Sequence, residues 1–227
     1  MNQIKIIGTS HIAEQSVKEI EETIARENPE VVAIELDSDR AQALLANQKS
    51  RVSLTEIFQI GARGYLFAKI GQYVQQKLGK MVGMAPGADM KAAITAARRN
   101  NIKVALIDQP IKVTLKNFSK ALTWKERWRF FADIIKGIIQ PRRQMQELGL
   151  KEFNLHSVPK TELIEKMIQK LEERYPSVYK TLVMDRNRYM ARKLIKLSRI
   201  HSGQIIAVVG AGHKKGMEEL LSKLEAV

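Results

Sequence analysis

Four short runs rich in isoleucine and valine constrain the fold of this chain more than any other feature of its sequence. Each run has the length and apolar composition of a strand buried on both faces, and each lies beside a segment with one apolar face at helical spacing. Because parallel strands need crossover connections of helical length, this alternation predicts an α/β fold with a mainly parallel central sheet and flanking helices. The four predicted strands are Ile4–Ile7, Val31–Leu36, Val104–Ile107 and Ile205–Val209.

The helices that flank these strands are predicted from apolar residues spaced three and four positions apart. One precedes the second strand and ends before Pro29, one precedes the third strand, and one follows the fourth. With 227 residues, 44% of them apolar, we expect a single domain over residues 1–227 with a basic helical insertion at about 50–150. The three helices are defined by Val17, Ile20 and Ile24, by Met90, Ala93, Ile94 and Ala97, and by Met217, Leu220, Leu221 and Leu224.

Two further helical segments begin at a capping-box pattern, in which Ser or Thr precedes Glu by three residues. The first, Leu54–Leu78, is apolar and contains glycines, and we expect it either to make a groove for a peptide or to lie against a membrane. The second, Trp124–Ile138, combines aromatic and aliphatic residues with lysine and arginine. This composition predicts either a core-packing helix with a solvated basic face or contact with a membrane surface, and the segment is also a candidate for self-association into a homo-oligomer.

The charge balance favours anionic partners without identifying one. Lysine and arginine number 38 against 24 aspartates and glutamates, which gives a net charge of +14. We rank nucleic acid low because the basic residues are scattered rather than gathered in a recognised module. The sequence shows no signal peptide and no run of about 18 apolar residues, so we expect a cytoplasmic protein, either peripheral to a membrane or excised from a membrane-anchored one.

Polar residues follow the predicted strands at the point where each strand ends. Ligands of open parallel sheets bind beyond the carboxyl ends of the strands, so these residues are predicted to converge on one edge of the sheet. The first and fourth strands run into Gly8-Thr9-Ser10-His11 and Gly210-Ala211-Gly212-His213, the second ends at Glu35-Leu36-Asp37, and the third ends at Asp108.

The pattern Gly-x-x-His therefore occurs twice at equivalent positions, ending at His11 and at His213. We expect its glycines to allow a tight turn with positive φ and the close approach of a bound group. One such histidine is more often a structural turn residue, whereas two favour a site. The remaining histidines, His156 and His201, lie in loop-like surroundings and are interpreted as ordinary exposed residues. The glycines in question are Gly8, Gly210 and Gly212.

The chain contains no cysteine, so histidine, aspartate and glutamate are its only strong metal ligands. Glu35 closes a buried apolar run, and a carboxylate there needs a cation, a metal or several hydrogen-bond donors. Two histidines with one or two carboxylates suit zinc, manganese or cobalt and leave a position for a water nucleophile. The alternative is a structural salt bridge from Glu35 to a helix donor or to Arg40.

A second sign of a buried charged site is Arg186, which falls within the apolar stripe of the helix predicted after Pro176. A guanidinium that faces the core should have an anionic partner or a ligand. Arg186 could orient a site carboxylate or stabilise a developing oxyanion, and a structural ion pair is the competing interpretation.

Taken in order, these motifs resemble the TraB family, and the resemblance spans nearly the whole chain. It adds one acidic position, Asp89, where the family usually carries glutamate, so that the carboxylate here is drawn back by a methylene. The matching segments are Gly8-Thr9-Ser10-His11 with Ser16, Val31–Leu36 with Arg40, Gly87–Met90, Leu106–Asp108, Asp185-Arg186 with Tyr189–Ala191, and Val208–His213.

The resemblance implies the fold of TraB, TIKI and erythromycin-esterase-like proteins, and a metal-dependent hydrolase, most often a peptidase, that acts on a peptide or protein. It gives catalytic roles to His11, Glu35, Arg186 and His213, with a divalent metal (Mn, Co or Zn) held by the two histidines, Glu35 and Asp89. The alternative from a different class is a non-catalytic module of the pheromone-shutdown kind, which binds or sequesters a peptide at a membrane surface.

Overall fold

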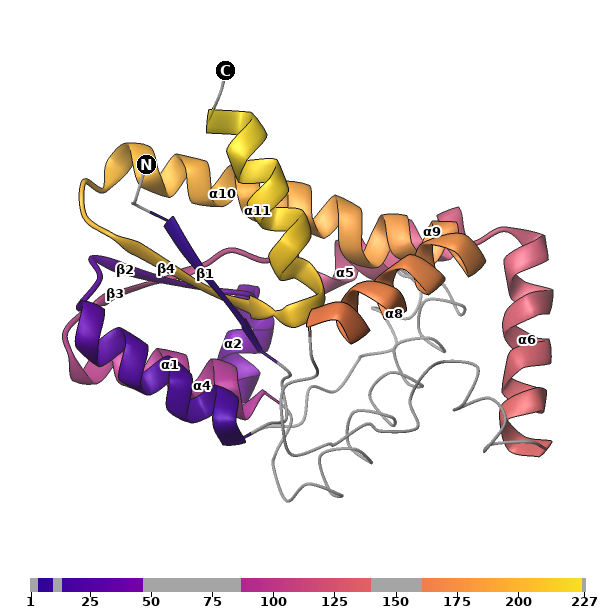
Figure 1. Cartoon of the computed structure of the whole chain (residues 1–227), viewed down its shortest axis with the longest axis horizontal. Helices are drawn as coiled ribbons and strands as arrows, with labels where there is room; N and C mark the ends of the chain where they lie inside the picture. The colour runs from indigo at the N-terminus through magenta and orange to yellow at the C-terminus, as the bar shows by residue number, and fades with distance from the viewer. Residues whose placement is uncertain (1–3, 10–13, 47–86, 140–160, 226–227) are drawn as a thin grey trace.

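The computed structural model of the chain describes residues 4–9, 14–46, 87–139 and 161–225 (Figure 1). Four strands in these ranges form one parallel sheet in the order β1-β4-β2-β3, which confirms the predicted α/β fold. Each strand overlaps its predicted run. The strands are β1 (Ile4–Thr9), β2 (Val31–Ile34), β3 (Lys103–Leu106) and β4 (Ile205–Gly210).

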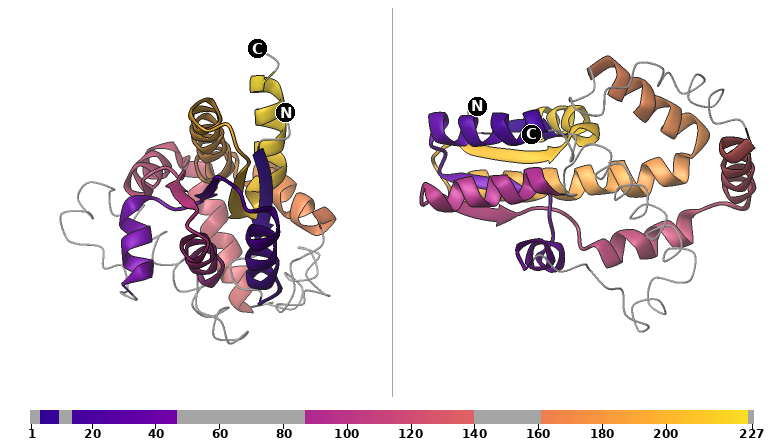
Figure 2. Two further views of the ribbon diagram at one scale, coloured as in Figure 1. Left: turned by 90° about the vertical axis from the view of Figure 1, so that its left-hand side faces the viewer. Right: turned by 90° about the horizontal axis from the view of Figure 1, so that it is seen from below.

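Helices cover both faces of the sheet (Figures 1 and 2). Alternate residues of the central strands enter opposite layers, because successive side chains of a strand point to opposite faces. Ile34 and Val208 belong to the core shared with α1 and α4, whereas Ala33 and Val209 belong to the core shared with α10 and α11. Each of these helices overlaps a predicted helical segment. They are α1 (Glu14–Glu27), α4 (Ala88–Arg99), α10 (Asp185–Ile200) and α11 (Ala211–Glu225).

The connections at the carboxyl edge of the sheet are short. β4 ends at Gly210 and α11 begins at the next residue, so the chain passes from strand to helix without a loop. After β2, Asp37 caps helix α2 (Ser38–Leu45), and after β3 the chain enters helix α5 (Ile111–Ala121). The sequence patterns did not predict these two helices.

The helix predicted after Pro176 is present but is not uniform. It begins as α9 (Pro176–Tyr179), widens into one π-helical segment (Lys180–Met184) and continues as α10. Helix α8 (Thr161–Arg174) precedes it. The π-helical segment ends immediately before Asp185 and Arg186, and such single wide turns are frequent at functional sites.

Helix α6 (Trp124–Ile139) lies at the end of the molecule farthest from the sheet (Figure 1). Its predicted capping box is confirmed, because Glu126 N donates to Thr123 Oγ1 at 3.2 Å and Thr123 N donates to Glu126 Oε2 at 2.9 Å. The other predicted segment, Leu54–Leu78, lies outside the described residues. Within the described ranges, no helix is both long enough and apolar enough to cross a bilayer.

Candidate functional site

A buried group of charged side chains lies at the carboxyl edge of the sheet. Glu35 follows β2, Asp108 follows β3, and His213 lies in the first turn of α11, directly beyond β4. Arg186, from the start of α10, reaches all three. Glu35, Asp108 and His213 are 4–7% exposed, so the predicted convergence of strand-end residues is realised for the described members of the set.

The guanidinium of Arg186 is the centre of this group. Its Nε and Nη2 donate to the two oxygens of Asp108 at 3.1 and 2.7 Å, and Nη2 also donates to Glu35 Oε1. Its Nη1 donates to the carbonyl of Leu182 at 3.2 Å and lies 3.0 Å from His213 Nε2. Since a guanidinium has five N–H groups, these five contacts use every donor of Arg186.

Two carboxylates keep Arg186 charged despite its burial. Burial by itself lowers the pKa of the guanidinium, but the charge of Glu35 and the hydrogen bond and charge of Asp108 outweigh it, so the pKa is raised. The expectation that Arg186 has an anionic partner is therefore confirmed. A permanently charged guanidinium in turn holds the neighbouring carboxylates in fixed positions.

The imidazole of His213 is held by a residue that the sequence analysis missed. His213 Nδ1 lies 2.6 Å from Asn187 Oδ1, which accepts only, so Nδ1 carries the proton. Nε2 presents a lone pair, because it lies 3.0 Å from Arg186 Nη1, which donates only. That lone pair lies 3.3 Å from Glu35 Oε1. The available signal was spacing, because Asn187 shares the inward face of α10 with Met190 and Leu194, three and seven residues further on.

Glu35 is also hydrogen-bonded within the protein. Its Oε2 accepts from the backbone N–H of Gly210 at 2.6 Å, which ties the end of β2 to the end of β4. The alternative pairing of Glu35 with Arg40 is wrong. Arg40 instead bonds Asp37 at 3.0 Å and also contacts Asp108, so it extends the charged network toward α2.

The expected conformation of the motif glycines is also wrong. In the described residues only Gly87 among the glycines has a positive φ, because strand β4 and helix α11 follow each other directly and need no left-handed turn. What Gly8 provides is space, since a Cβ there would lie 3.2 Å from the Ala211 backbone. A Cβ on Gly212 would lie 3.3 Å from Ile168. Gly210 contributes its N–H to Glu35.

The predicted metal ligands are only partly described. His11 lies outside the described residues, so its position relative to His213 stays a prediction. Asp89 is buried and accepts a hydrogen bond from Thr9 at the end of β1 and another from the N–H of Met90 at 2.8 Å. Among the described residues, no three histidine, aspartate or glutamate side chains are grouped to hold a metal ion, so Glu35, Asp89 and His213 do not form such a set without His11.

The interpretation of His156 and His201 as ordinary exposed residues is wrong for one of them. His201 is not an ordinary exposed residue, because its side chain is only 14% exposed and its Nδ1 lies 2.6 Å from Glu30 Oε1. This contact joins the end of α10 to the start of β2, at the edge of the sheet opposite the charged group. His156 lies outside the described residues.

The sequence from residue 2 to residue 227 matches the model of the TraB/PrgY/gumN family. An uncharacterized protein of Methanocaldococcus jannaschii is 34% identical over 227 aligned residues, which cover 98% of this chain and 54% of that protein. TraB domain-containing proteins of Mus musculus and Homo sapiens are each 24% identical over 249 aligned residues, covering 96% of this chain. The chain spans 54–62% of the length of these relatives.

Proposed function

The chain belongs to the TraB/PrgY/gumN family, and on that premise we propose that it is a metal-dependent hydrolase of peptides centred on Glu35, Arg186 and His213. The observation that carries the proposal is a histidine lone pair and a carboxylate, 178 residues apart in sequence (213 − 35), whose atoms lie 3.3 Å apart in a buried site. Both are oriented by further hydrogen bonds, because His213 donates to Asn187 and Glu35 accepts from Gly210. Support for a peptide as substrate comes from the family resemblance.

The donor set suits a divalent cation. His213 donates its Nδ1 proton to Asn187, and metal-bound histidines usually hold their second nitrogen in this way. Glu35 Oε1 and His213 Nε2 would be two ligands and His11 the third, with Asp89 as a fourth candidate. A bound metal would supply a water nucleophile at neutral pH. Because Arg186 Nη1 contacts the same His213 nitrogen, metal and guanidinium would compete for that lone pair.

Arg186 acts in this proposal mainly as a positioning residue. All five of its donors are used by the protein, so stabilising an oxyanion would require it to release one partner. The partner released would be His213, because a metal on its Nε2 would take the lone pair that Arg186 Nη1 now contacts. Glu35 or Asp108 would accept the proton from the attacking water.

Because all five N–H donors of Arg186 are used by the protein, a second candidate function is also favoured, that of a module that binds a peptide and performs no chemistry. If the charged group is a closed structural network, its role is to fix the strand ends and the surface above them. The two functions differ in their response to a chelator, because only the hydrolase would lose activity.

The test is metal content and peptide cleavage in protein purified without chelator. We expect the wild type to retain Mn, Co or Zn by elemental analysis and to release products from an unstructured peptide mixture by mass spectrometry. His11→Ala, His213→Ala and Glu35→Gln should each lower metal affinity by at least about tenfold. His201→Ala serves as the matched control, because it removes a partly buried histidine at the opposite edge of the sheet.

Equal metal content in the wild type and the three site variants would end the hydrolase proposal. Peptide binding that survives a chelator, without products, would establish the binding module in its place.

A further inference from the structure

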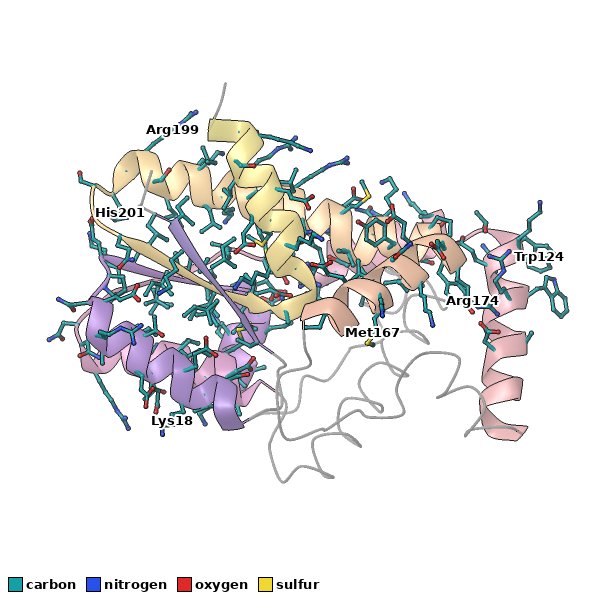
Figure 3. All side chains as sticks on the ribbon, in the orientation of Figure 1. Lys18, Trp124, Met167, Arg174, Arg199 and His201 are labelled. Atoms are coloured by element: carbon teal, nitrogen blue, oxygen red, sulfur yellow. The ribbon has the colours of Figure 1, made fainter. Side chains whose placement is uncertain are left out.

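The end of the molecule remote from the sheet carries both tryptophans of the chain, Trp124 and Trp128, on helix α6. They are 64% and 60% exposed, and Figure 3 shows Trp124 projecting outward from that end. Large aromatic side chains seldom stay this exposed in pairs unless they serve a contact. The two rings meet edge to face, with centroids 6.1 Å apart.

These tryptophans belong to one continuous exposed face. At about 100° per residue, an arc of roughly 140° on α6 contains both tryptophans and three other exposed residues. Lys125 and Arg129 lie on one flank of the tryptophan pair, where Arg129 also donates to the carbonyl of Arg174 at 2.7 Å. Arg127 lies on the other flank, with its guanidinium 5.4 Å from the Trp124 ring. The face comprises Trp124, Lys125, Trp128, Arg129 and Ala132.

The opposite side of α6 is fixed to the rest of the protein. Glu126 is 3% exposed and accepts from the N–H of Ser177, at the start of α9, at 2.8 Å. Asp133 forms an ion pair with Arg174 and accepts from the hydroxyl of Tyr175 at 2.5 Å. The exposed face is therefore presented by a helix that is anchored from behind.

We propose that this face of α6 docks on an anionic lipid surface. Tryptophan rings favour the boundary between headgroups and acyl chains, while lysine and arginine beside them bind anionic headgroups. The net charge of +14 adds attraction to such a surface at longer range. The proposal concerns location and is independent of the chemistry at the sheet edge.

Two other partners fit the face less well. Single-stranded nucleic acid stacks its bases on open aromatic faces, but the two rings stand at 90° and Arg127 lies over the Trp124 ring. A second copy of the chain would bring Lys125 and Arg129 of both copies together in a symmetric contact, which like charges oppose. An anionic surface instead complements these charges.

The test uses the whole chain and vesicles of phosphatidylcholine with or without phosphatidylserine. Because both tryptophans lie on the proposed contact face, intrinsic fluorescence reports on it directly. We expect the tryptophan emission to shift to shorter wavelength with vesicles that contain phosphatidylserine and to shift less with phosphatidylcholine alone. Raising the salt concentration should reverse the shift.

Variants separate the face from the overall charge. In vesicle co-sedimentation, Trp124→Ala/Trp128→Ala and Lys125→Glu should each weaken binding to the anionic vesicles by roughly tenfold or more. Lys196→Glu, an equal charge reversal at an exposed position of α10, should change binding by less than about twofold. Circular dichroism and thermal melting confirm that each variant is folded.

Three results would overturn the proposal. One is equal weakening by Lys125→Glu and Lys196→Glu, which would mean that net charge alone drives binding. Another is the absence of any shift with anionic vesicles. The third is a concentration-dependent dimer in sedimentation velocity, or a complex with single-stranded DNA, that requires both tryptophans while vesicles do not bind.

Discussion

Two arginine–carboxylate clusters in this protein share their chemistry but differ in their surroundings. Arg186 lies in the charged group at the sheet edge with 14% of its side chain exposed, and Arg174 joins α8 to α6 with 47% exposed. The pKa of both guanidinium groups is raised. At Arg186 burial opposes the charge and two carboxylates overcome it, whereas at Arg174 the hydrogen bond to Asp133 is the largest influence.

The difference shows what burial does to an ion pair. An exposed pair is screened by water and contributes little, because its charges are well solvated when apart. In a buried group, each charge depends on its partners, so removing one leaves the others without compensation. The sheet-edge cluster should therefore be far more sensitive to substitution than the cluster at α6, although both look similar in their bonding.

The largest effect is expected from Arg186→Met, which keeps most of the side-chain volume but leaves Glu35 without its cation. We expect the free energy of unfolding to fall by about 3–5 kcal/mol in urea denaturation. Arg188→Met, two residues along the same helix and half exposed, is the control and should cost less than about 0.5 kcal/mol. Equal effects of the two substitutions would refute the contrast.

A smaller effect within the site is expected from Gly216→Ala. A Cβ at this position would lie 2.5 Å from Nδ2 of Asn187, whose Oδ1 holds His213, so the Asn187 amide must shift. Repacking of this kind costs about 1–3 kcal/mol, measured by thermal melting. For stability alone, Gly212→Ala in the same helix is the control, because its nearest neighbour is the flexible end of Ile168 at 3.3 Å. Alanine in a helix is itself favoured over glycine by about 1 kcal/mol, so a Gly216→Ala variant more stable than the wild type by that amount would show that Asn187 is not held as described.

The smallest effect is expected from Asp133→Asn, which removes the carboxylate that Arg174 and Tyr175 share. At neutral pH the unfolding free energy should change by no more than about 1 kcal/mol. Burial and Asp133 raise the pKa of Tyr175 to about 12, from about 10 in the unfolded chain. This contribution to stability is complete below pH 10 and is lost as the pH rises toward 12. Spectrophotometric titration should find the Tyr175 phenol ionising earlier in the variant, and an unchanged titration would contradict the assignment.

Much of the fold was predictable because it depends on local periodicity. The apolar runs of β2 and β4 and the helical spacing in α1, α4 and α11 are visible in the sequence, and the capping box located the start of α6. Helices α2 and α5 were missed because their beginnings depend on Asp37 and Pro110, whose roles emerge only once the strand ends are placed.

The sequence predicted which residues at the strand ends belong to the site, but not which of them pair with each other. Glu35 and His213 follow from where parallel strands end, and Arg186 from its place in an apolar stripe. Nothing local in the sequence indicates that Asp108 is the bidentate partner of Arg186, 78 residues away, or that Glu30 pairs with His201 across 171 residues. The prediction of a positive φ at the motif glycines was wrong because β4 continues directly into α11.

The π-helical turn at Lys180–Met184 determines which face of α10 carries Arg186 toward the sheet. Before the turn, α9 packs against α5. After the turn, α10 packs on the sheet. If the same five residues wound as an ordinary α-helix, one part would be rotated by about 100° relative to the other, because the wide turn accommodates one extra residue. The Arg186 guanidinium would then no longer face the strand ends, even with every residue of the charged group present. The wide turn therefore fixes the orientation of Arg186 relative to its partners.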